Sequence, residues 1–591
     1  MLTVLLSAGS LPAGAARGGG APWVYLGKNV FERDRAGRVL GEVSRVFVGD
    51  RFLAQAERLR GPYLDYLAGL GRGRSGSLEW WVGSLACRNT YASDFFFLLC
   101  YLAVFDGLVR DPAAAGWTVV VEDPWLFAQL RRDFDGKARF FGSPRLAWRR
   151  AGTALRSLVG RAWWAWVLLR SWLLTRRWSA GPAPGAAGAG AVALYSVPQR
   201  RCFKAAGEWR DFYTGGLFEL LRRAGIPVFR LVPPETVGFE GEVCARRETV
   251  FPLMSLLTPL DILRENLRFG PWTLRPGDRH AVAGLRTDVL ARAEAWRDGF
   301  SPTIARWRLY YVALGRLFKA ELCGKVVFPY ENISPDRVLC LAARDHGGIR
   351  TVGYQHNIVS RFALPFFLGR DEAESMPIPD RILASGNYNL EMLAAGGTPT
   401  DRLEMGGAWR YLYALDGEGA GGEPLGNEVL VCLPDDDKQS DALLCALIKA
   451  FGSAEARPHF HVKFHPTTPE RRTAYWRRNP LFSAVDGDLK DWVRHHRPAA
   501  ILFVGSTVGV EFALQGFKVL QYLPETFIGH DPMDALPPEF YSRCTDRDIR
   551  ERVSECLADR RPPRLAPEEV RRQSARIWGR IDEDRWLAAV R

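Results

Sequence analysis

The chain has 591 residues, of which 47% are hydrophobic and 25% are charged, so general disorder is excluded and more than one folded domain is expected. The formal net charge is +13, but it is unevenly placed: residues 136–207 contain thirteen Lys or Arg and no acidic residue, and the rest of the chain is close to neutral. A single basic block favours a surface contact over nucleic-acid binding.

The cysteine pattern and the hydropathy narrow the class of protein further. The 10 cysteines are scattered, the closest two being twelve positions apart, which fits reduced thiols better than a disulfide framework or a zinc site. No stretch reaches ~18 uninterrupted apolar residues, so we expect no membrane-spanning helix. The apolar opening has no basic leader and is not typical of a secretory signal. We therefore expect a cytoplasmic protein, with no cofactor and no essential metal.

Residues 1–144 alternate apolar runs with helical stretches. Residues 117–121 are typical of a buried strand that ends in an acidic loop at Glu122 and Asp123, followed by a helix and by a further strand at 138–142. We interpret 1–144 as the first part of an N-terminal Rossmann-like domain.

Residues 145–191 break this pattern. Arg149, Arg156, Arg170 and Arg177 are spaced by multiples of seven and should share one helix face, with Trp and Leu on the other. This composition is typical of a helix lying in anionic lipid headgroups, and we expect it to protrude from the domain. A buried helical hairpin with its Arg in water is the alternative. Residues 179–191, rich in Gly, Ala and Pro, are expected to form a linker. The predicted membrane-contact residues are Arg149, Arg156, Trp163, Trp166, Arg170 and Arg177.

Strand signals resume after the linker in two sets. Residues 192–375 are expected to complete the N-terminal domain, with a crossover at about 366–379. Residues 376–591 should form a C-terminal domain whose first strand is at 381–384. The predicted fold is α/β: two doubly wound parallel sheets facing one another across a cleft, with a basic Trp-rich helical insertion.

Two strand ends in the last third of the sequence carry small and polar residues, after the apolar runs at 459–464 and 500–504. Because the carboxyl ends of parallel strands share one edge of a sheet, the two loops are expected side by side. An imidazole, two hydroxyls and a helix start suit a phosphate, whereas a structural loop histidine and simple N-capping are the alternatives. The candidate phosphate-binding residues are His465, Pro466, Gly505, Ser506 and Thr507.

Further polar residues follow these and other strands. Glu511, one turn into the helix after 505–507, could accept from ribose hydroxyls or be a first-turn acid. The acidic loop 435–437 could bind a base, a sugar or a cation, and a solvated loop is the alternative. Glu331 and His356 end two successive strands of the first domain and should face the phosphate loops. Glu331 would deprotonate an acceptor hydroxyl or attack the anomeric carbon, and His356 would bind or protonate the departing phosphate. An ion-paired Glu331 and a core His356 are the alternatives.

The His-Pro strand end and the Ser-Thr helix start resemble motifs of bacterial GT-B sialyltransferases and polysialyltransferases, Kdo transferases and the CDP-glycerol polymerases of teichoic acid synthesis. That resemblance implies that His465, Ser506 and Thr507 hold the phosphate of a CMP or CDP leaving group. Residues 385–387 and 406–410 are similar to the first two loops of such domains, which implies that Gly386 allows close backbone approach and that Arg410 helps to neutralise phosphate.

Two motifs in the middle of the chain resemble signatures of bacterial surface-carbohydrate biosynthesis proteins. These are Phe-Pro-Tyr-Glu-Asn at 328–332 and Gly-Tyr-Gln-His-Asn at 353–357, in which Asn332 and Asn357 stand where the family has Gly.

Together, the resemblances imply a glycosyltransferase of lipopolysaccharide O-antigen or capsule synthesis that uses a CMP-activated ulosonic acid. A CDP- or UDP-dependent transferase, an epimerase-like enzyme of the same pathway and a non-catalytic nucleotide-sugar-binding protein remain alternatives. The expected partners are a nucleotide sugar, a lipid-linked or oligosaccharide acceptor and an anionic membrane surface, without nucleic acid. We expect the protein at the inner face of the cytoplasmic membrane.

Overall fold

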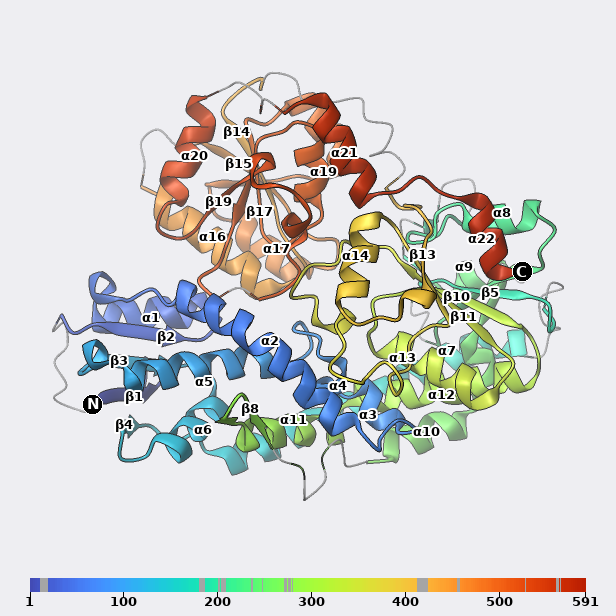
Figure 1. Ribbon diagram of the computed structural model, residues 1–591, viewed down its shortest axis with the longest axis horizontal. Helices are drawn as coiled ribbons and strands as arrows, with labels where there is room; N and C mark the ends of the chain where they lie inside the picture. The colour runs from blue at the N-terminus through green and yellow to red at the C-terminus, as the bar shows by residue number, and fades with distance from the viewer. Residues whose placement is uncertain are drawn as a thin grey trace.

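The computed structural model contains three parallel β-sheets, each covered by helices (Figure 1). It describes the chain except residues 11–19, 180–186, 200–201, 204–208, 235–237, 247, 270–273, 275–277, 279, 412–423, 454–457, 527, 560–562 and 564. Most of the predicted linker 179–191 therefore lies outside the described residues. The α/β class with parallel sheets is confirmed.

The N-terminal unit is built on a four-stranded sheet of order β2-β3-β1-β4. Its most buried helix is α5 (Phe95–Arg110), an almost wholly apolar sequence that fills the space beside the sheet. Its strands are β1 (Leu2–Leu6), β2 (Trp23–Leu26), β3 (Thr118–Val121) and β4 (Ala138–Phe141), and its other helices are α1 (Val30–Leu40), α2 (Gly49–Gly71), α3 (Leu78–Val82), α4 (Ser84–Cys87) and α6 (Pro124–Phe134). The expectation that 1–144 shares a sheet with 192–375 is wrong, because these strands pair only with one another among the described residues.

The middle unit holds a seven-stranded sheet of order β13-β12-β11-β10-β5-β6-β7. Its strands are β5 (Val192–Tyr195), β6 (Val228–Val232), β7 (Val250–Pro252), β10 (Lys325–Pro329), β11 (Arg350–Gln355), β12 (Arg381–Ala384) and β13 (Leu403–Met405). Its helices are α8 (Leu217–Arg223), α9 (Glu240–Cys244), α10 (Pro259–Leu267), α11 (Asp288–Phe300), α12 (Pro302–Lys319), α13 (Ser334–His346) and α14 (Asn387–Ala395). A short hairpin of β8 (Ala281–Val282) and β9 (Leu285–Arg286) lies beside them.

The predicted domain boundary near 376 is also wrong. Strand β12 pairs in parallel with β11, with Val352 opposite Arg381, and β13 extends the same sheet. The sheet of the C-terminal domain begins only at Glu428. An apolar strand has the same residue pattern whichever sheet it joins, so the sequence placed the strand correctly but not its partner.

The C-terminal domain holds a six-stranded parallel sheet of order β16-β15-β14-β17-β18-β19, which matches the doubly wound Rossmann order. Its strands are β14 (Glu428–Cys432), β15 (His459–Lys463), β16 (Phe482–Ala484), β17 (Ala500–Phe503), β18 (Val519–Tyr522) and β19 (Ser542–Cys544). Its helices are α16 (Asp437–Phe451), α17 (Glu470–Arg477), α18 (Leu489–His496), α19 (Val508–Leu514), α20 (Ile549–Ala558) and α21 (Pro567–Ile577). The last helix, α22 (Glu583–Val590), returns to the middle unit, where Trp586 donates to Gly406 O at 2.7 Å.

The two larger sheets have the same topology, and each changes winding direction between two adjacent strands. In the middle sheet this switch lies between β5 and β10, and in the C-terminal sheet between β14 and β17. Ligands of open α/β sheets bind in the crevice at such a switch, outside the carboxyl ends of the strands. The predicted arrangement of two Rossmann-like domains facing a cleft is confirmed, with the four-stranded unit as an addition.

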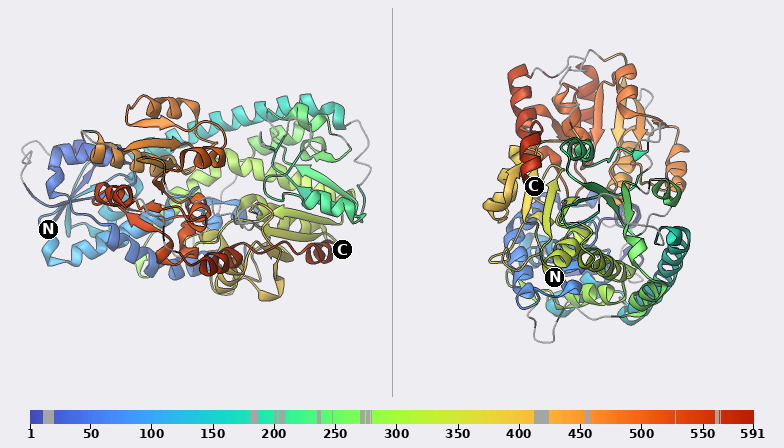
Figure 2. Two further views of the ribbon diagram at one scale, coloured as in Figure 1. Left: turned by 90° about the horizontal axis from the view of Figure 1, so that it is seen from above. Right: turned by 90° about the vertical axis from the view of Figure 1, so that its right-hand side faces the viewer.

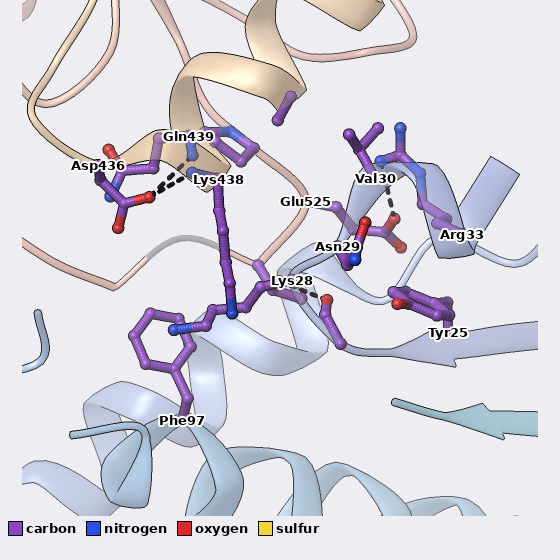
Figure 3. A pocket seen from close by; sticks show the side chains of 14 residues that line it. Tyr25, Lys28, Asn29, Val30, Arg33, Phe97, Asp436, Lys438, Gln439 and Glu525 are labelled. Atoms are coloured by element: carbon purple, nitrogen blue, oxygen red, sulfur yellow. Dashed lines mark hydrogen bonds and ion pairs between the residues drawn. The ribbon is translucent and has the colours of Figure 1, made fainter. Parts of the chain in front are cut away.

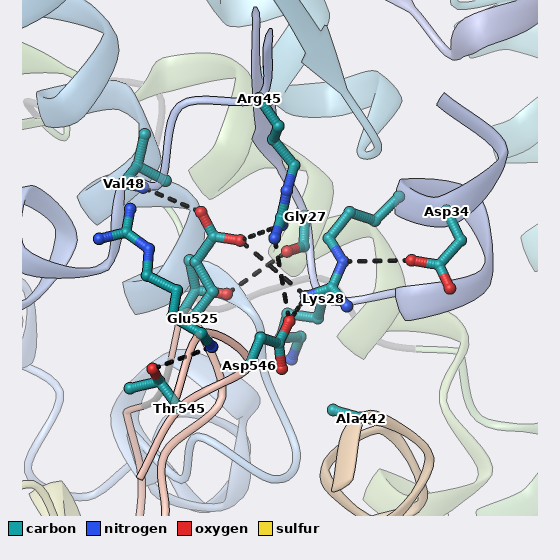
Figure 4. A network of polar contacts seen from close by, with 12 residues as sticks. Gly27, Lys28, Asp34, Arg45, Val48, Ala442, Glu525, Thr545 and Asp546 are labelled. Atoms are coloured by element: carbon teal, nitrogen blue, oxygen red, sulfur yellow. Dashed lines mark hydrogen bonds and ion pairs between the residues drawn. The ribbon is translucent and has the colours of Figure 1, made fainter. Parts of the chain in front are cut away.

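A buried ion-pair network ties the N-terminal unit to the C-terminal domain (Figure 4). Glu525, only 7% exposed, accepts from Arg45 Nη1 at 2.8 Å and from Val48 N at 2.9 Å. Arg33 Nη1 lies 2.7 Å from Asp546 Oδ2 and 3.9 Å from Glu525 Oε2. Two arginines of one unit thus face two carboxylates of the other, which fixes how the strand-end loops of the two units meet.

Helix α7 (Leu146–Ser179) is a single helix along the outside of the molecule, visible as the long teal helix in both views of Figure 2. It does not protrude and it is not a hairpin, because it packs lengthwise against α10, α11 and α12. Arg161 anchors it: the side chain is buried and donates to five backbone carbonyls, with Phe300 O at 2.8 Å and Asn266 O at 2.9 Å the nearest.

Candidate active-site cleft

The strand-end loops of all three units line one cleft of about 680 Å³. This volume lies within the range of small-molecule sites. Six of the predicted site residues meet there, from two different sheets, which supports the expectation that the loops face one another. These six are Glu331, Arg410, His465, Gly505, Ser506 and Thr507.

Glu331 lies directly after β10, beside the switch of the middle sheet. Its side chain is 37% exposed toward the cleft, and its Oε1 accepts a hydrogen bond from Asn357 Nδ2. Burial raises the pKa of the Glu331 carboxyl above its usual range, opposed by the charge of Arg410 and the Asn357 hydrogen bond. A carboxylate with a raised pKa at the wall of a cleft has the properties of a general base.

His356 lies behind Glu331 and does not line the cleft. The ring is 1% exposed, with Nε2 at 3.5 Å from Glu331 Oε1 and Tyr213 packed edge-on at 4.5 Å between ring centroids. Burial, followed by the charge of Arg410, lowers the pKa of His356 to about 3, so the ring is neutral at physiological pH. The predicted contact with a phosphate is therefore corrected: the His356 ring is buried outside the cleft, as its core-residue alternative implied.

Asn332 and Asn357, which stand where the similar signatures have Gly, have structural roles here. Asn332 adopts the left-handed region with φ of 54°, which asparagine tolerates better than most residues. Its buried amide donates to Pro365 O, and its Oδ1 accepts from Arg337 Nε at 3.2 Å. Asn357 links two site residues, because it donates to Glu331 and accepts from Arg410 Nη1 at 3.3 Å.

Arg410 brings a positive charge to the same wall of the cleft as Glu331, because it follows β13 of the middle sheet and both residues contact Asn357. Its guanidinium lies 4.2 Å from the ring centroid of Phe212 and 5.1 Å from that of Tyr411, which holds the planar group in place. A guanidinium oriented in this way suits an anionic ligand group.

His465 is oriented by the neighbouring loop after β14. Its Nδ1 lies 2.6 Å from Thr467 Oγ1 and 3.4 Å from Asp435 Oδ1, and Thr467 in turn donates to Asp435. Asp436 caps α16 by accepting from the backbone N–H groups of Lys438 and Gln439, and Asp437 pairs with Arg472 at 2.9 Å. The acidic loop 435–437 therefore has local partners, and all three of its residues line the cleft. Among the described residues, no group of His, Cys, Asp or Glu side chains is arranged to hold a metal ion.

The loop 505–507 turns sharply from β17 into α19. Gly505 has φ of +50°, which glycine adopts without strain. Ser506 Oγ accepts from Val508 N at 3.4 Å, whereas the Thr507 side chain makes no capping hydrogen bond. Capping thus accounts for Ser506 only, and both residues line the cleft.

Besides His356, three predicted residues do not line the cleft. Gly386 packs against the backbone of α21, where a Cβ would overlap the carbonyl oxygen of Ile577, so this glycine admits a protein segment and not a ligand. Pro466 is exposed beside His465. Glu511 lies in α19, where its charge acts on Lys490.

The cleft also contains residues that the sequence motifs did not identify: Lys28, Tyr91, Arg297, Lys438 and His530. Figure 3 shows Lys438 reaching from the start of α16 toward Lys28 and Phe97. Lys28 pairs with Asp94, and its Nζ lies 4.2 Å from the ring centroid of Phe97. His530 lies in the loop after β18, an apolar run whose polar loop is of the same kind as the strand ends considered in the sequence. Arg297 lies within α11 and gave no signal.

The outer face of α7 combines aromatic and basic side chains. Trp148, Trp163 and Trp166 are 80%, 61% and 55% exposed, and the last two stack at 5.2 Å between ring centroids. Arg149 and Arg156 are exposed on the same helix, and Arg170, half-exposed, lies 3.5 Å from Glu240. The Arg177 side chain lies outside the described residues. The predicted separation of Arg and Trp onto opposite faces is wrong, because Trp163 stands on the seven-residue stripe of the arginines. No helix among the described residues is long and apolar enough to cross a membrane.

No protein-family model and no curated protein sequence matches this chain. Among solved structures, this chain is similar in backbone structure to the lipopolysaccharide outer core galactosyltransferase WaaB, at 10% identity and a TM-score of 0.36 over 68% of this chain and 99% of that one. S. aureus MnaA with UDP matches at 10% identity and 0.38 over 67% and 95%. UDP-GlcNAc 2-epimerase from Methanocaldococcus jannaschii matches at 10% identity and 0.34 over 64% and 97%. At TM-scores this low the likenesses carry no argument about activity, and the strand order of the chain itself defines the fold.

Proposed function

We propose that this chain is a glycosyltransferase of bacterial surface-polysaccharide synthesis that takes its sugar from a nucleotide donor. The observation that supports this most is the meeting of Glu331 with Arg410, His465, Ser506 and Thr507 in one cleft. The Glu331 carboxylate, whose pKa is raised, and the Arg410 guanidinium lie on the wall from the middle unit and face His465, Ser506 and Thr507 on the wall from the C-terminal domain. That combination fits group transfer from a phosphate leaving group, because the base and the leaving-group site are both present.

The donor would lie with its phosphate against the C-terminal domain. The Ser506 and Thr507 hydroxyls and the His465 ring would contact the phosphate oxygens, and Arg410 would balance charge as the leaving group departs. We favour a CMP-activated ulosonic acid, such as Kdo or a sialic acid, because the His-Pro and Ser-Thr motifs resemble transferases of that class. A CMP leaving group needs little acid assistance, which agrees with the neutral state of His356 behind the cleft.

Glu331 would act on the acceptor. Its carboxylate takes the proton of the acceptor hydroxyl as the acceptor oxygen bonds to the anomeric carbon. Asn357 holds the carboxylate through a hydrogen bond, and the His356 ring packs behind it, so its orientation is set before substrate binds.

The donor class is tested by nucleotide release and by calorimetry. Purified protein is titrated with CMP, CDP and UDP, and incubated with the corresponding sugars. We expect CMP to bind most tightly and CMP release to need an acceptor. Release from UDP donors only would reject the CMP assignment, and no binding of any of the three nucleotides would reject the glycosyltransferase proposal.

We further propose that α7 attaches the protein to the inner face of the cytoplasmic membrane, where a lipid-linked acceptor would be available. The support is an acid-free helix whose outer face carries exposed Trp and Arg together, with Leu260 and Leu267 of the adjoining α10 exposed by 73% and 70%. Each Arg near anionic lipid adds ~1 kcal/mol, and Trp inserts at the headgroup level.

Vesicle co-sedimentation tests this attachment. Binding should appear with anionic liposomes, fall with added salt and largely disappear when Trp163, Trp166 and Arg170 are replaced by Ser. The matched control replaces Arg471 and Tyr475, an exposed pair on α17, and should sediment as the wild type does. Equal sedimentation with neutral and anionic vesicles, or none with either, would contradict the proposal.

A further inference from the structure

A second, smaller cavity of about 210 Å³ opens from the cleft at Glu331. It shares Glu331, Asn357, Thr90, Tyr91 and His530 with the cleft, and we call it the side pocket. The carboxylate of Glu331 therefore stands at the junction of two cavities. A base that serves a two-substrate transfer needs this placement, because it must touch one substrate while the other reacts beside it.

The wall of the side pocket that lies away from the cleft is largely apolar. Ile333, Ala363 and Pro365 line it together with Phe362 and Phe366, which are 5% and 6% exposed. Tyr330 packs edge-on against Phe366 at 6.0 Å between ring centroids, so this wall is backed by the protein core. Rigid aromatic and aliphatic surfaces of this kind suit the C–H face of a pyranose ring.

The charges of the two cavities differ. The cleft combines the cations Lys28, Arg297, Arg410 and Lys438 with Glu331 and the carboxylates Asp94, Asp435, Asp436 and Asp437, whereas no Lys or Arg is among the described residues that line the side pocket. His530 adds no charge, because burial lowers its pKa to about 4. Glu331 is therefore the single ionised group there, and an anionic ligand would meet repulsion without a compensating cation.

All three units contribute to the side pocket. Tyr91 comes from the N-terminal unit, Phe362 and Phe366 from the middle unit and His530 from the C-terminal domain. The backbone N–H of His530 donates to the Tyr91 hydroxyl at 3.4 Å, which bridges the first and the last of these units at the rim. The side pocket is therefore complete only with the units placed as they are here.

We propose that the side pocket binds the acceptor as an uncharged pyranose with one hydroxyl directed at Glu331. This inference rests on the proposed glycosyl transfer and adds the class of acceptor and its location. In the reaction the acceptor O–H proton passes to Glu331, the acceptor oxygen bonds to the anomeric carbon, and the bond from that carbon to the donor phosphate breaks, its electron pair leaving with the nucleotide.

The test uses the full chain loaded with CMP and two probes, a methyl hexopyranoside and the corresponding methyl hexopyranosiduronate. Saturation-transfer NMR suits such small ligands, whose dissociation constants are on the order of 1 mM. We expect saturation of the neutral glycoside to exceed that of the uronate at least fivefold. Equal or stronger binding of the uronate would overturn the proposal.

Two variants locate the binding. Ala363→Leu narrows the side pocket, and Ile333→Ala, at a half-buried side chain, removes apolar surface from its wall; neither residue lines the cleft. Each should reduce saturation of the glycoside at least fivefold and leave CMP affinity within twofold. The matched control is Tyr475→Ala, 59% exposed on α17, which should change neither. Unchanged glycoside binding in both pocket variants would overturn the location, whereas absence of nucleotide binding in the wild type would reject the proposed function instead.

Discussion

Replacement of Glu331 by Gln removes the proposed base with little change in shape. The amide oxygen of Gln still accepts from Asn357 Nδ2, and the side chain still fills the space in front of His356. What disappears is the ionised carboxylate and its capacity to take a proton. Nucleotide binding should therefore stay within twofold of the wild type, since His465, Ser506 and Thr507, which are proposed to bind the phosphate, lie on the opposite wall.

The size of the kinetic effect follows from the role. A positioned base contributes 10²–10⁴-fold, so kcat should fall by about that factor, which corresponds to roughly 2.7–5.5 kcal/mol in activation free energy. The pH profile gives a second reading. Burial raises the pKa of Glu331 above its ordinary value of 4.5, and the ionised form is the active one, so kcat/KM should rise with pH through an apparent pKa above 4.5. That rise should be absent in the Gln variant.

The assay measures nucleotide release with saturating donor and acceptor, beside calorimetry with the free nucleotide. Glu539→Gln, an exposed carboxylate outside the cleft, is the matched control and should retain full activity. If Glu331→Gln kept more than half of the wild-type kcat, the base would have to be sought among the other carboxylates of the cleft, Asp94 and the loop 435–437, because Glu122 and Asp123 do not line it. A variant that lost nucleotide binding together with turnover would refute the separation of the two walls.

Four further outcomes are expected. His465→Ala should weaken CMP binding tenfold or more in calorimetry, because a charged hydrogen bond contributes about 1.5–3 kcal/mol, and unchanged affinity would reject its phosphate role. Arg161→Met leaves buried carbonyls without donors and should lower the urea-derived free energy of unfolding by roughly 1–3 kcal/mol, whereas Arg156→Met on the same helix should stay within about 0.5. Glu525→Ala leaves Arg33 and Arg45 with less compensation and should cost about 3–5 kcal/mol in the same measurement, a loss that Glu539→Ala should not reproduce. The folded-state pKa of His356, about 3, lies below its ordinary 6.5, so the unfolded state binds the extra proton. The contribution of His356 to the free energy of unfolding is therefore full above pH 6.5 and falls as the pH drops toward 3. His356→Phe should reduce the loss of unfolding free energy between pH 6.5 and 4.5 by up to roughly 2–3 kcal/mol.

Much of the fold could be predicted because each strand is a short apolar run with a polar end. The expected strands at 117–121, 138–142 and 500–504 correspond to β3, β4 and β17. The grouping of strands into sheets could not be predicted in the same way. Pairing of β12 with β11 depends on contacts between segments distant in sequence, such as Trp586 of α22 against Leu383, and no local pattern encodes them.

The residues of the candidate site likewise divide into those that the sequence could identify and those that only the three-dimensional structure reveals. Residues at strand ends, such as Glu331, His465 and Ser506, could be found because parallel topology places strand ends together. Gly386 also follows a strand, but the loop is covered by α21, and only the three-dimensional path of the chain reveals this. The phosphate contact predicted for His356 was wrong for a different reason. His356 follows β11, the strand beside β10, but its ring points into the core, where Tyr213 packs against it.

The location of the cleft follows from the strand order of both sheets together. At each switch the connections of adjacent strands run to opposite faces, so the loops diverge and leave a crevice that side chains of the sheet do not fill. Glu331 follows β10 at one switch, and Gly505, Ser506 and Thr507 follow β17 at the other. A ligand that spans both crevices must therefore contact both walls. The bridges from Arg33 and Arg45 to the C-terminal domain and from His530 to Tyr91 hold the walls at this separation. A site assembled from loops of three units depends on these bridges. Loosening them should weaken acceptor binding before nucleotide binding. The side chains proposed to bind the phosphate belong mainly to one domain, whereas the side pocket needs all three units.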